Sequence, residues 1–314
     1  MDNKLSFTSA DTIPFKLLLN DGVKRLDPIH AQWLPTNRCN LNCSFCSCSE
    51  RDKSREMEYA RAQVVIQDLA ELGCKSVTIT GGGEPLCYER LPEMIEYFRE
   101  NGILVGLVTN GTLLERLDQK TLDLITWCRI SSSDDRALTS KYRQTLEGAV
   151  GRGPNVDWAF SHVVTSAPNH QTIRDVVEFA NEHRQFTHVR LVADIPNANH
   201  TDLGEVSERL QGIDSLVIYQ PRKDPVKSTT CMIGYIKPVI SPDFKVYLCC
   251  GVQYAPETPS RDLPDSLSIG SAFNLKNIYR NKKVFRVDCA RCYYESYNAA
   301  LRPLLTGMYH EEFV

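Results

Sequence analysis

Four of the twelve cysteines in this chain lie within the ten-residue stretch CNLNCSFCSC, from Cys39 to Cys48. Cys39, Cys43 and Cys46 are spaced C-x3-C-x2-C, and three thiolates on one loop are typical of a metal site. A structural zinc ion usually takes four ligands, whereas three cysteines leave one iron of a cubane cluster open to another molecule. The odd number of thiols therefore favours an iron–sulfur cluster.

A second concentration of cysteines lies in the last third of the chain and comprises Cys231, Cys249, Cys250, Cys289 and Cys292. A C-x17-C pair followed by a C-x2-C pair supplies four thiolates. Four thiolates suit either a zinc knuckle or a fully ligated iron–sulfur cluster. The spacing alone leaves both kinds of site open.

The elements that must position the first cysteines alternate regularly along the chain. Apolar residues recur with a helical period over 57–72, 88–101, 113–125, about 137–150, 173–183 and shortly after Thr201. Between them, β-rich runs cover 30–34, 75–80, 103–109, 128–133, 156–165, 189–195 and 216–220. This alternation predicts an α/β fold of parallel βαβ units. About six units favour a partial (β/α)6 TIM-like barrel, with an open doubly wound sheet as the alternative.

The alternation breaks past about residue 225, where turn-rich sequence surrounds short predicted strands at 235–241 and 245–250. We therefore expect three parts: an N-terminal extension (1–29), the partial barrel (30–222) and a small C-terminal α+β domain (223–314). The first cysteines directly follow the first strand, where α/β barrels carry their chemistry.

Composition and charge favour a cytoplasmic protein. No apolar stretch approaches the roughly 20 residues that span a bilayer, so we expect no membrane partner. Twelve cysteines without a secretory signal favour metal binding or catalysis over disulfides. The formal net charge of -3 and the lack of a basic stretch disfavour nucleic acid as a partner.

Three further motifs follow later strands. They are TGGGEP at 80–85, VTNGTLL at 108–114 and ISSSDD at 130–135. Glycines allow the backbone to approach a ligand closely, and a carboxylate suits a cation. Taken singly, such segments are also ordinary turns and helix N-caps.

CNLNCSFC together with GGGEP resembles the radical S-adenosylmethionine (radical SAM) superfamily, in which three cysteines hold a [4Fe-4S] cluster and its fourth iron binds SAM. The resemblance implies that Cys39, Cys43 and Cys46 are cluster ligands and gives Cys48 no role. It also implies contacts to SAM from Phe45, Gly82, Gly83, Glu84, Asn110, Ser131, Ser133 and Asp134.

CMIGYIKPVISPDFKVYLCC, SIGSAFNLKNIYRN and CARC resemble the auxiliary-cluster extensions called SPASM and twitch. The number of cysteines resembles the shorter twitch-type domain, which implies one auxiliary [4Fe-4S] cluster held by Cys231, Cys249, Cys289 and Cys292. The family's Asp-Gly-x-Val-x-x-Cys pattern maps onto 243–249 and favours Cys249 over Cys250, although Phe244 replaces the usual Gly. The resemblance covers about residues 30 to 300.

The resemblance implies an enzyme that reductively cleaves SAM to a 5′-deoxyadenosyl radical and abstracts a hydrogen atom from a small polar substrate. An external donor such as flavodoxin or ferredoxin would supply the electron. The net result would be oxidation (dehydrogenation) or epimerisation and isomerisation, so the protein would be an oxidoreductase or an isomerase. Cys250 is the candidate catalytic thiol that returns a hydrogen atom, with a small buried apolar side chain as the alternative.

Two other substrate classes and one non-enzymatic function stay open. Relatives also modify ribosomally made peptides, but the roughly thirty residues before the barrel are short for a leader-binding domain. Modification of a nucleoside or a DNA base is the other enzymatic alternative. An iron–sulfur or zinc-binding scaffold is the non-enzymatic one, and the intact cysteine and GGGEP motifs argue against it.

Overall fold

The computed structural model describes residues 27–194, 203–221, 226–254, 263, 265–280 and 285–298. Its central sheet contains seven parallel strands in sequence order: β1 His30–Trp33, β2 Ser76–Ile79, β3 Leu104–Thr109, β4 Ile125–Ser133, β5 Asp157–Val164, β6 Phe186–Ala193 and β7 Val217–Gln220. β7 pairs only with β6, so the sheet does not close on itself. The expected partial barrel is confirmed.

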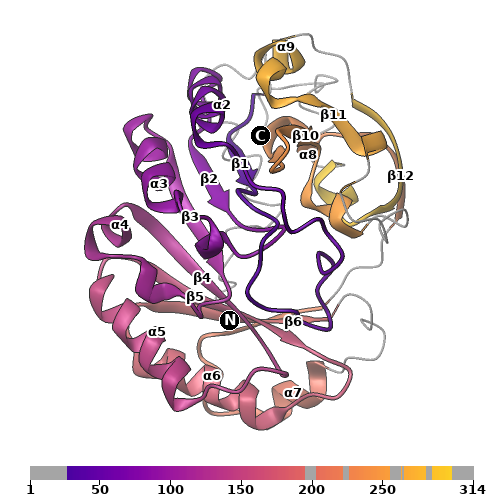
Figure 1. The fold of residues 1–314 in the computed structure, drawn as a ribbon. Helices are drawn as coiled ribbons and strands as arrows, with labels where there is room; N and C mark the ends of the chain where they lie inside the picture. The colour runs from indigo at the N-terminus through magenta and orange to yellow at the C-terminus, as the bar shows by residue number, and fades with distance from the viewer. Residues whose placement is uncertain are drawn as a thin grey trace, which may run out of the picture.

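The helices that connect these strands lie along the outer face of the curved sheet (Figure 1). They are α2 Tyr59–Glu71, α3 Leu91–Glu100, α4 Gln119–Asp123, α5 Ser140–Arg152, α6 His170–Glu182 and α7 Leu203–Arg209. Their apolar sides and alternate strand residues form one core that includes Leu69, Phe98, Trp158 and Phe160, all fully buried. The opposite, inner face of the sheet is thereby left free of helices.

Local sequence sets where several of these helices begin. The Glu58 carboxylate accepts hydrogen bonds from the first amides of α2, and Asp118 does the same for α4. Asn169 caps α6 by accepting a hydrogen bond from the Thr172 amide. Such caps satisfy amide groups that have no partner within the helix.

The C-terminal residues continue the same sheet. β9 Val239–Ile240 pairs in parallel with β1, and β10 Lys245–Tyr247 and β11 Ser268–Ser271 follow in antiparallel pairing. β8 Val226–Cys231 and β12 Phe285–Cys292 form a separate two-stranded sheet, and α9 Leu275–Arg280 packs near α2. The proposed boundary at residue 222 stays a prediction, and residues 1–26 of the N-terminal extension lie outside the described residues.

The strand expected over 235–241 is wrong in its first half, because Ile233–Ile236 form the short helix α8. The buried Asn298 explains this difference. Its Oδ1 accepts hydrogen bonds from the backbone amides of Met232 and Ile233, at 2.8 and 3.1 Å. A cap supplied from so far along the chain leaves no trace in the local pattern.

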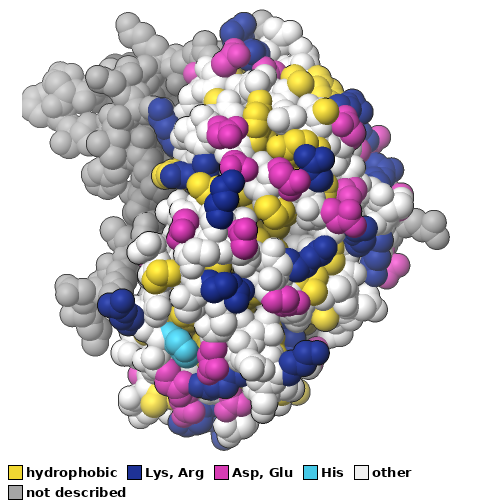
Figure 2. Space-filling view, turned by 60° about the vertical axis from the view of Figure 1, so that its left-hand side comes forward, with side chains coloured by type: hydrophobic (Ala, Val, Ile, Leu, Met, Phe, Trp, Pro, Cys, Tyr) yellow, Lys and Arg dark blue, Asp and Glu magenta, His cyan; other side chains and the backbone are white. Residues whose placement is uncertain are grey.

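The surface shown in Figure 2 carries Lys and Arg side chains interspersed with Asp and Glu. Several surface charges of the described residues form ion pairs, as in Lys120 with Glu96 and Arg90 with Glu93. Among the described residues, no helix combines the length and the apolar character that a membrane span requires.

Candidate functional site

The loop after β1 carries the first three cysteines and is closed at its base by backbone hydrogen bonds. The Met57 amide donates to the Pro35 carbonyl at 2.8 Å, and the Asn37 amide donates to the Arg55 carbonyl at 2.9 Å. These bonds hold the two ends of the loop together at the carboxyl end of β1. The sequence prediction of a cysteine loop at this edge agrees with that position.

The cysteine sulfurs already accept backbone hydrogen bonds. The Leu41 amide donates to the Cys39 Sγ and the Cys48 amide donates to the Cys46 Sγ, each at 3.4 Å. Burial raises the pKa of the Cys39 thiol, and a hydrogen bond with Cys48 followed by burial raises that of Cys46. Cys43 adds to the pKa increase of both, so the three thiols are near one another. Bound iron would favour the thiolate forms that a cluster requires.

The GGGEP segment lies directly against the residues that lead into this loop. The Gly83 amide donates to the Thr36 carbonyl at 3.0 Å, and the Glu84 amide donates to the Arg38 carbonyl at 2.8 Å. A Cβ atom at Gly83 would lie 2.2 Å from the Arg38 carbonyl oxygen, and one at Gly82 would lie 2.1 Å from the Asn37 side chain. Glycine is therefore needed here for contact between two loops, whatever ligand they hold.

The Glu84 carboxylate is almost fully buried and binds the end of β3. Its Oε1 accepts from the Leu86 amide at 3.0 Å and the Thr109 hydroxyl at 2.6 Å, and its Oε2 accepts from the Asn110 amide at 2.7 Å. Burial raises the pKa of Glu84 while these three hydrogen bonds oppose the increase. The Glu84 carboxylate therefore holds the GGGEP segment against the end of β3. The partly exposed residues of this segment are glycines, so it presents backbone to a ligand.

Asn110 links the end of β3 to the cysteine loop. Its Nδ2 donates to the Asn40 side chain at 2.9 Å, and its Oδ1 accepts from the Thr112 amide at 2.9 Å. The Tyr142 hydroxyl donates to the Asn110 carbonyl at 2.8 Å. Asn40, next to Cys39, is a positioning residue that no pattern in the sequence singled out.

The polar residues at the end of β4 divide between the two faces of the sheet. Ser132, His162 and Asp134 form a buried chain with 3.0 and 2.9 Å contacts, and Asp134 Oδ2 accepts from the Thr165 amide and hydroxyl. Both Asp134 oxygens thus bind protein groups. Ser131 is partly exposed.

The remaining predicted SAM contacts are close to this edge. Ser133 is buried, and Phe45 is partly exposed between Cys43 and Cys46. The Ser44 hydroxyl donates to Asp135 at 3.0 Å, which ties the cysteine loop to the residues after β4. The loop therefore contacts the carboxyl ends of β3 and β4.

The second set of cysteines is also brought together. Cys231 ends β8, Cys289 and Cys292 lie in β12, and Cys249 follows β10. Burial is the main cause that raises the pKa of Cys231 and of Cys249, and each is raised further by Cys289. A hydrogen bond with Cys289 raises the pKa of Cys292, which Cys249 raises further. The four thiols predicted as auxiliary ligands therefore lie near one another.

Asn298 organises two of these four thiols, and sequence reasoning missed it. The side chain is fully buried, caps the amides that follow Cys231, and directs its Nδ2 toward Cys292 Sγ at 3.6 Å. A single Asn near the end of a cysteine-rich segment carries no signal by which it could have been found.

The neighbouring cysteines Cys249 and Cys250 have different surroundings. Cys249 lies with Cys231 and Cys289, whereas the Cys250 Sγ lies 2.7 Å from the Tyr294 hydroxyl. Cys250 also packs against a small apolar cluster that includes Leu34 at the end of β1. After burial, the Cys250 thiol raises the pKa of Cys249 most, more than Cys231 or Cys289 does, so it lies close to the predicted ligands. The choice of Cys249 over Cys250 as the ligand stays a prediction.

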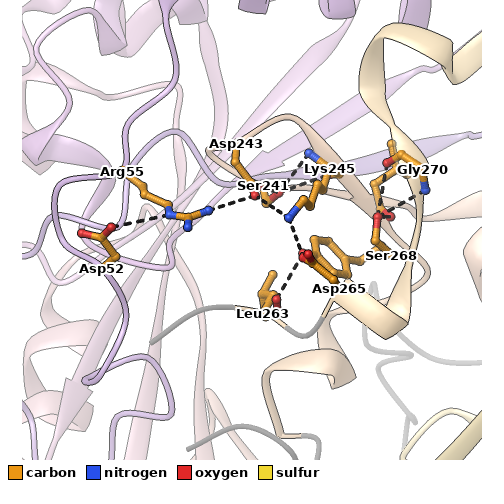
Figure 3. Close-up of polar contacts among 11 residues, drawn as sticks. Asp52, Arg55, Ser241, Asp243, Lys245, Leu263, Asp265, Ser268 and Gly270 are labelled. Carbon is orange, nitrogen blue, oxygen red and sulfur yellow. Dashed lines mark hydrogen bonds and ion pairs between the residues drawn. The ribbon is translucent and has the colours of Figure 1, made fainter. Parts of the chain in front are cut away.

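Ion pairs connect the cysteine loop to the C-terminal residues (Figure 3). Arg55 lies 3.6 Å from Asp52 and 3.1 Å from Asp243, and Lys245 lies 3.2 Å from the same Asp243. Although burial opposes it, hydrogen bonds from Ser241 and Lys245 lower the pKa of Asp243. One carboxylate therefore joins the two cysteine-bearing parts.

Phe244, at the position where the twitch pattern has Gly, adopts the left-handed conformation with φ of 58°. It is the one non-glycine residue with positive φ that is seen in the described ranges. Its buried ring lies 5.0 Å from that of Phe273, and the Arg61 guanidinium lies over both rings. The turn thus keeps the left-handed conformation that favours Gly. This conformation costs backbone energy at Phe244, and the packing of its ring against Phe273 and Arg61 offsets that cost.

Both donor sets consist of cysteine thiols, which are the ligands that iron–sulfur clusters take. In the described part of the chain, no three Cys, His, Asp or Glu side chains converge as ligands of one metal ion. A cubane spreads its cysteines around four irons, so nearby thiols need not converge on one point. Three thiols near an open edge and four near one another fit one cluster each.

The other cysteines are structural or flank the site. Cys74 and Cys128 are buried in the main core, and burial raises the pKa of Cys74 to about 12. Cys87 is partly exposed, and its pKa is raised by burial and by Glu84 and Cys39. Cys48 is buried against Cys46.

Comparison with known proteins agrees with this geometry. Residues 33–126 match the sequence model of the radical SAM superfamily. The chain is 35% identical over 115 residues to Fe-coproporphyrin III synthase of Methanosarcina barkeri and 32% identical over 116 residues to a probable GTP 3',8-cyclase of Methanococcus maripaludis. The first match covers 35% of this chain and 29% of the synthase, and the second covers 36% of this chain and 38% of the cyclase. The chain therefore spans well under half the length of either relative.

Solved structures share the fold over most of the chain. Streptococcus suis SuiB bound to S-adenosylmethionine has a TM-score of 0.59 at 16% identity, covering 81% of this chain and 66% of SuiB. anSMEcpe with bound AdoMet and the Cp18Cys peptide has a TM-score of 0.55 at 15% identity, covering 91% and 85%. At such low identity the likeness concerns the fold alone.

Proposed function

Because this chain carries a domain of the radical SAM superfamily over residues 33–126, we propose that it cleaves SAM reductively and oxidises or epimerises a small polar substrate. The family uses a [4Fe-4S] cluster and SAM. The observation that supports the proposal most directly is the grouping of three thiols beside the GGGEP backbone at the carboxyl edge of the sheet.

Cys39, Cys43 and Cys46 would hold the first cluster, and Cys231, Cys249, Cys289 and Cys292 an auxiliary [4Fe-4S] cluster. When bound, the first cluster and SAM supply a 5′-deoxyadenosyl radical that takes a hydrogen atom from the substrate. The residues of the chain bind and orient the cofactors and keep water from the reacting atoms.

The hydrogen bonds around the cysteine loop indicate which residues would bind the cofactors and which would position them. Hydrogen bonds from the Leu41 and Cys48 amides stabilise ligand thiolates, and Glu84 and Asn110 hold the neighbouring loops in place. Gly82, Gly83, Phe45 and Ser131 border the same edge and would contact SAM. Asp134 would act indirectly, since His162 and Thr165 occupy its carboxylate.

Net oxidation and epimerisation differ in the step after the first hydrogen transfer. Oxidation requires that the substrate radical lose an electron, for which an auxiliary cluster is suited. Epimerisation requires a group that returns a hydrogen atom, and Cys250 is a candidate because its thiol contacts the Tyr294 hydroxyl and is not needed to complete the predicted set of four ligands. Peptide and nucleoside substrates are the alternatives to a small polar molecule.

The direct test is anaerobic reconstitution with iron and sulfide, followed by reduction in the presence of SAM. We expect a brown protein that forms 5′-deoxyadenosine. Cys39→Ala should abolish that product, while Cys87→Ala, a matched control beside Cys39, should retain it. A colourless protein that forms no 5′-deoxyadenosine would indicate a scaffold.

A further inference from the structure

Arg51 is a buried arginine directly after the cysteine motif. Only 7% of the residue is exposed. The Arg51 amide donates to the Cys48 carbonyl at 3.3 Å, and the Cys48 amide donates to the Cys46 Sγ at 3.4 Å. One backbone turn therefore connects this arginine to a residue that contacts a predicted cluster ligand.

The Arg51 guanidinium packs against the GGGEP segment. Its Nη1 lies 2.4 Å from the point where a Cβ atom of Gly82 would be, and the Asn37 Oδ1 lies 2.1 Å from the same point. Asn37 comes two residues before Cys39. The guanidinium thus lies beside the segment that enters the cysteine motif, while its own backbone belongs to the segment that leaves it.

No carboxylate compensates the charge of Arg51 within the part of the chain that the structure describes. The Nη2 of Arg51 is buried there and has no hydrogen-bond acceptor. Asp52, the next residue, directs its carboxylate to the Ser54 hydroxyl at 2.6 Å and to Arg55 at 3.6 Å. The Asn37 side chain beside the guanidinium is a neutral amide.

The charge of Arg51 acts on the thiols of the cysteine loop. A hydrogen bond with Cys46 is the main cause that lowers the pKa of Cys48, and Arg51 adds to this decrease while burial opposes it. In the loaded protein Cys46 would be the ligand thiolate, and the Cys48 thiol would be the donor that faces it. Cys48 would then bring no charge of its own to compensate Arg51.

A buried guanidinium is costly unless an anion accompanies it. Arginine cannot avoid this cost by losing its proton. Three thiolates make the predicted first cluster an anionic site, and reduction adds one more negative charge to it. This cluster is therefore the anion available to compensate Arg51.

We propose that the buried Arg51 guanidinium is the counter-charge of the first cluster and raises its reduction potential. The inference rests on the proposed function, because it requires a cluster at Cys39, Cys43 and Cys46. One electron passes from the external donor, which is oxidised, to the cluster, which is reduced, and no bond forms and no proton moves. A nearby positive charge stabilises the product of this step more than its reactant.

The test is a redox titration of the reconstituted full chain without SAM, followed by electron paramagnetic resonance (EPR). The signal of the first cluster is the one that Cys39→Ala lacks. At the wild-type midpoint potential, Arg51→Gln should lower the ratio of reduced to oxidised cluster about tenfold, which is a shift of about 59 mV for one electron. Arg51→Lys, which keeps the charge, should retain most of the wild-type ratio.

Arg38→Gln is the matched control, because it also removes one positive charge beside the cysteine motif. The Arg38 side chain is 46% exposed and pairs with Glu56 at 2.9 Å. Water and salt screen a charge in such a position. The potential should therefore change much less than in Arg51→Gln.

Iron content and thermal unfolding separate this role from a structural one. A structural role predicts that Arg51→Gln and Arg51→Lys both lose iron or unfold at a lower temperature, while the clusters that remain keep the wild-type potential. That result would overturn the inference. If Arg51→Gln holds no cluster, Arg51→Met, whose apolar side chain suits a buried position, should show the same decrease in potential. Loss of the cluster from both neutral variants but not from Arg51→Lys would likewise show that the cluster requires this charge.

Equal potentials in the wild type and in Arg51→Gln would contradict the inference, as would an equal decrease in Arg38→Gln, which would assign the effect to net charge. If 5′-deoxyadenosine still forms, either result leaves the proposed function in place. An EPR spectrum from which Cys39→Ala removes no signal would contradict the proposed function and this inference together. The two failures are therefore distinguishable.

Discussion

The Sγ of Cys250 lies 2.7 Å from the hydroxyl oxygen of Tyr294, while the adjacent Cys249 lies with Cys231 and Cys289. The two thiols influence each other, since Cys250 adds to the increase that burial causes in the pKa of Cys249, but their other contacts differ. A 3-10 helix over Cys250–Tyr254 begins at the second of them. This divergence makes the two residues a matched pair for mutation.

The first prediction concerns iron content. Two cubanes imply about eight irons per chain, so Cys249→Ala should reduce the content toward about four, whereas Cys250→Ala should keep about eight. Loss of a ligand thiol leaves the auxiliary cluster incomplete, while loss of Cys250 removes a group outside it. Iron and sulfide assays after anaerobic reconstitution measure both, and the reverse pattern would exchange the two assignments.

The second prediction concerns the fate of the substrate radical. If Cys250 returns a hydrogen atom, product formed in deuterated water carries a solvent-derived label, because a thiol exchanges its hydrogen with solvent. Cys250→Ala should then lower the ratio of labelled product to 5′-deoxyadenosine at least tenfold. An unlabelled product from the wild type, or an unchanged ratio in the variant, would rule out this role and favour oxidation.

The third prediction concerns Asn298. Asn298→Ala leaves the buried amides of Met232 and Ile233 without an acceptor, which should cost about 1–3 kcal/mol of unfolding free energy. It also removes the donor to Cys292, so a chelator should extract the auxiliary iron faster. Asn277→Ala, on the exposed side of α9, is the control. Equal extraction rates for the two variants would contradict a positioning role.

The fourth prediction is a pH dependence that arises from His188. Burial and the nearby arginines lower its pKa from 6.5 in the unfolded chain to about 4 in the folded protein. Between these values the unfolded chain binds a proton that the folded protein does not, so stability falls as the pH decreases through this range.

His188→Asn should remove that part of the pH dependence, whereas His170→Asn, at the start of α6, should not. Urea unfolding at about pH 7 and about pH 5 measures the difference between each variant and the wild type. A His188 variant with the pH dependence of the wild type would show that this imidazole titrates normally.

Much of the barrel could be predicted because periodicity is a local property. The alternation of helical and β-rich runs placed the βαβ units, and chain direction then located the carboxyl edge. The continuation of the sheet through β9 could not be predicted, since Val239 and Ile240 form only a two-residue strand whose pairing with β1 is entirely tertiary. The helix at Ile233 depends likewise on distant Asn298.

The site could be predicted where the spacing of cysteines in the sequence indicates metal ligands. It could not be predicted where the role of a side chain depends on its buried contacts. Cysteine spacing identified both thiol groups. Glu84 was expected to face a cation, yet its oxygens bind Thr109, Leu86 and Asn110 within the protein.

Mass spectrometry for 5′-deoxyadenosine, after reduction of the reconstituted protein with SAM, tests whether Cys39, Cys43 and Cys46 serve SAM cleavage. We expect this product from the wild type and from Cys87→Ala, and none from Cys39→Ala. Formation of 5′-deoxyadenosine by Cys39→Ala at the wild-type rate would show that the Cys39 thiol is not required for SAM cleavage.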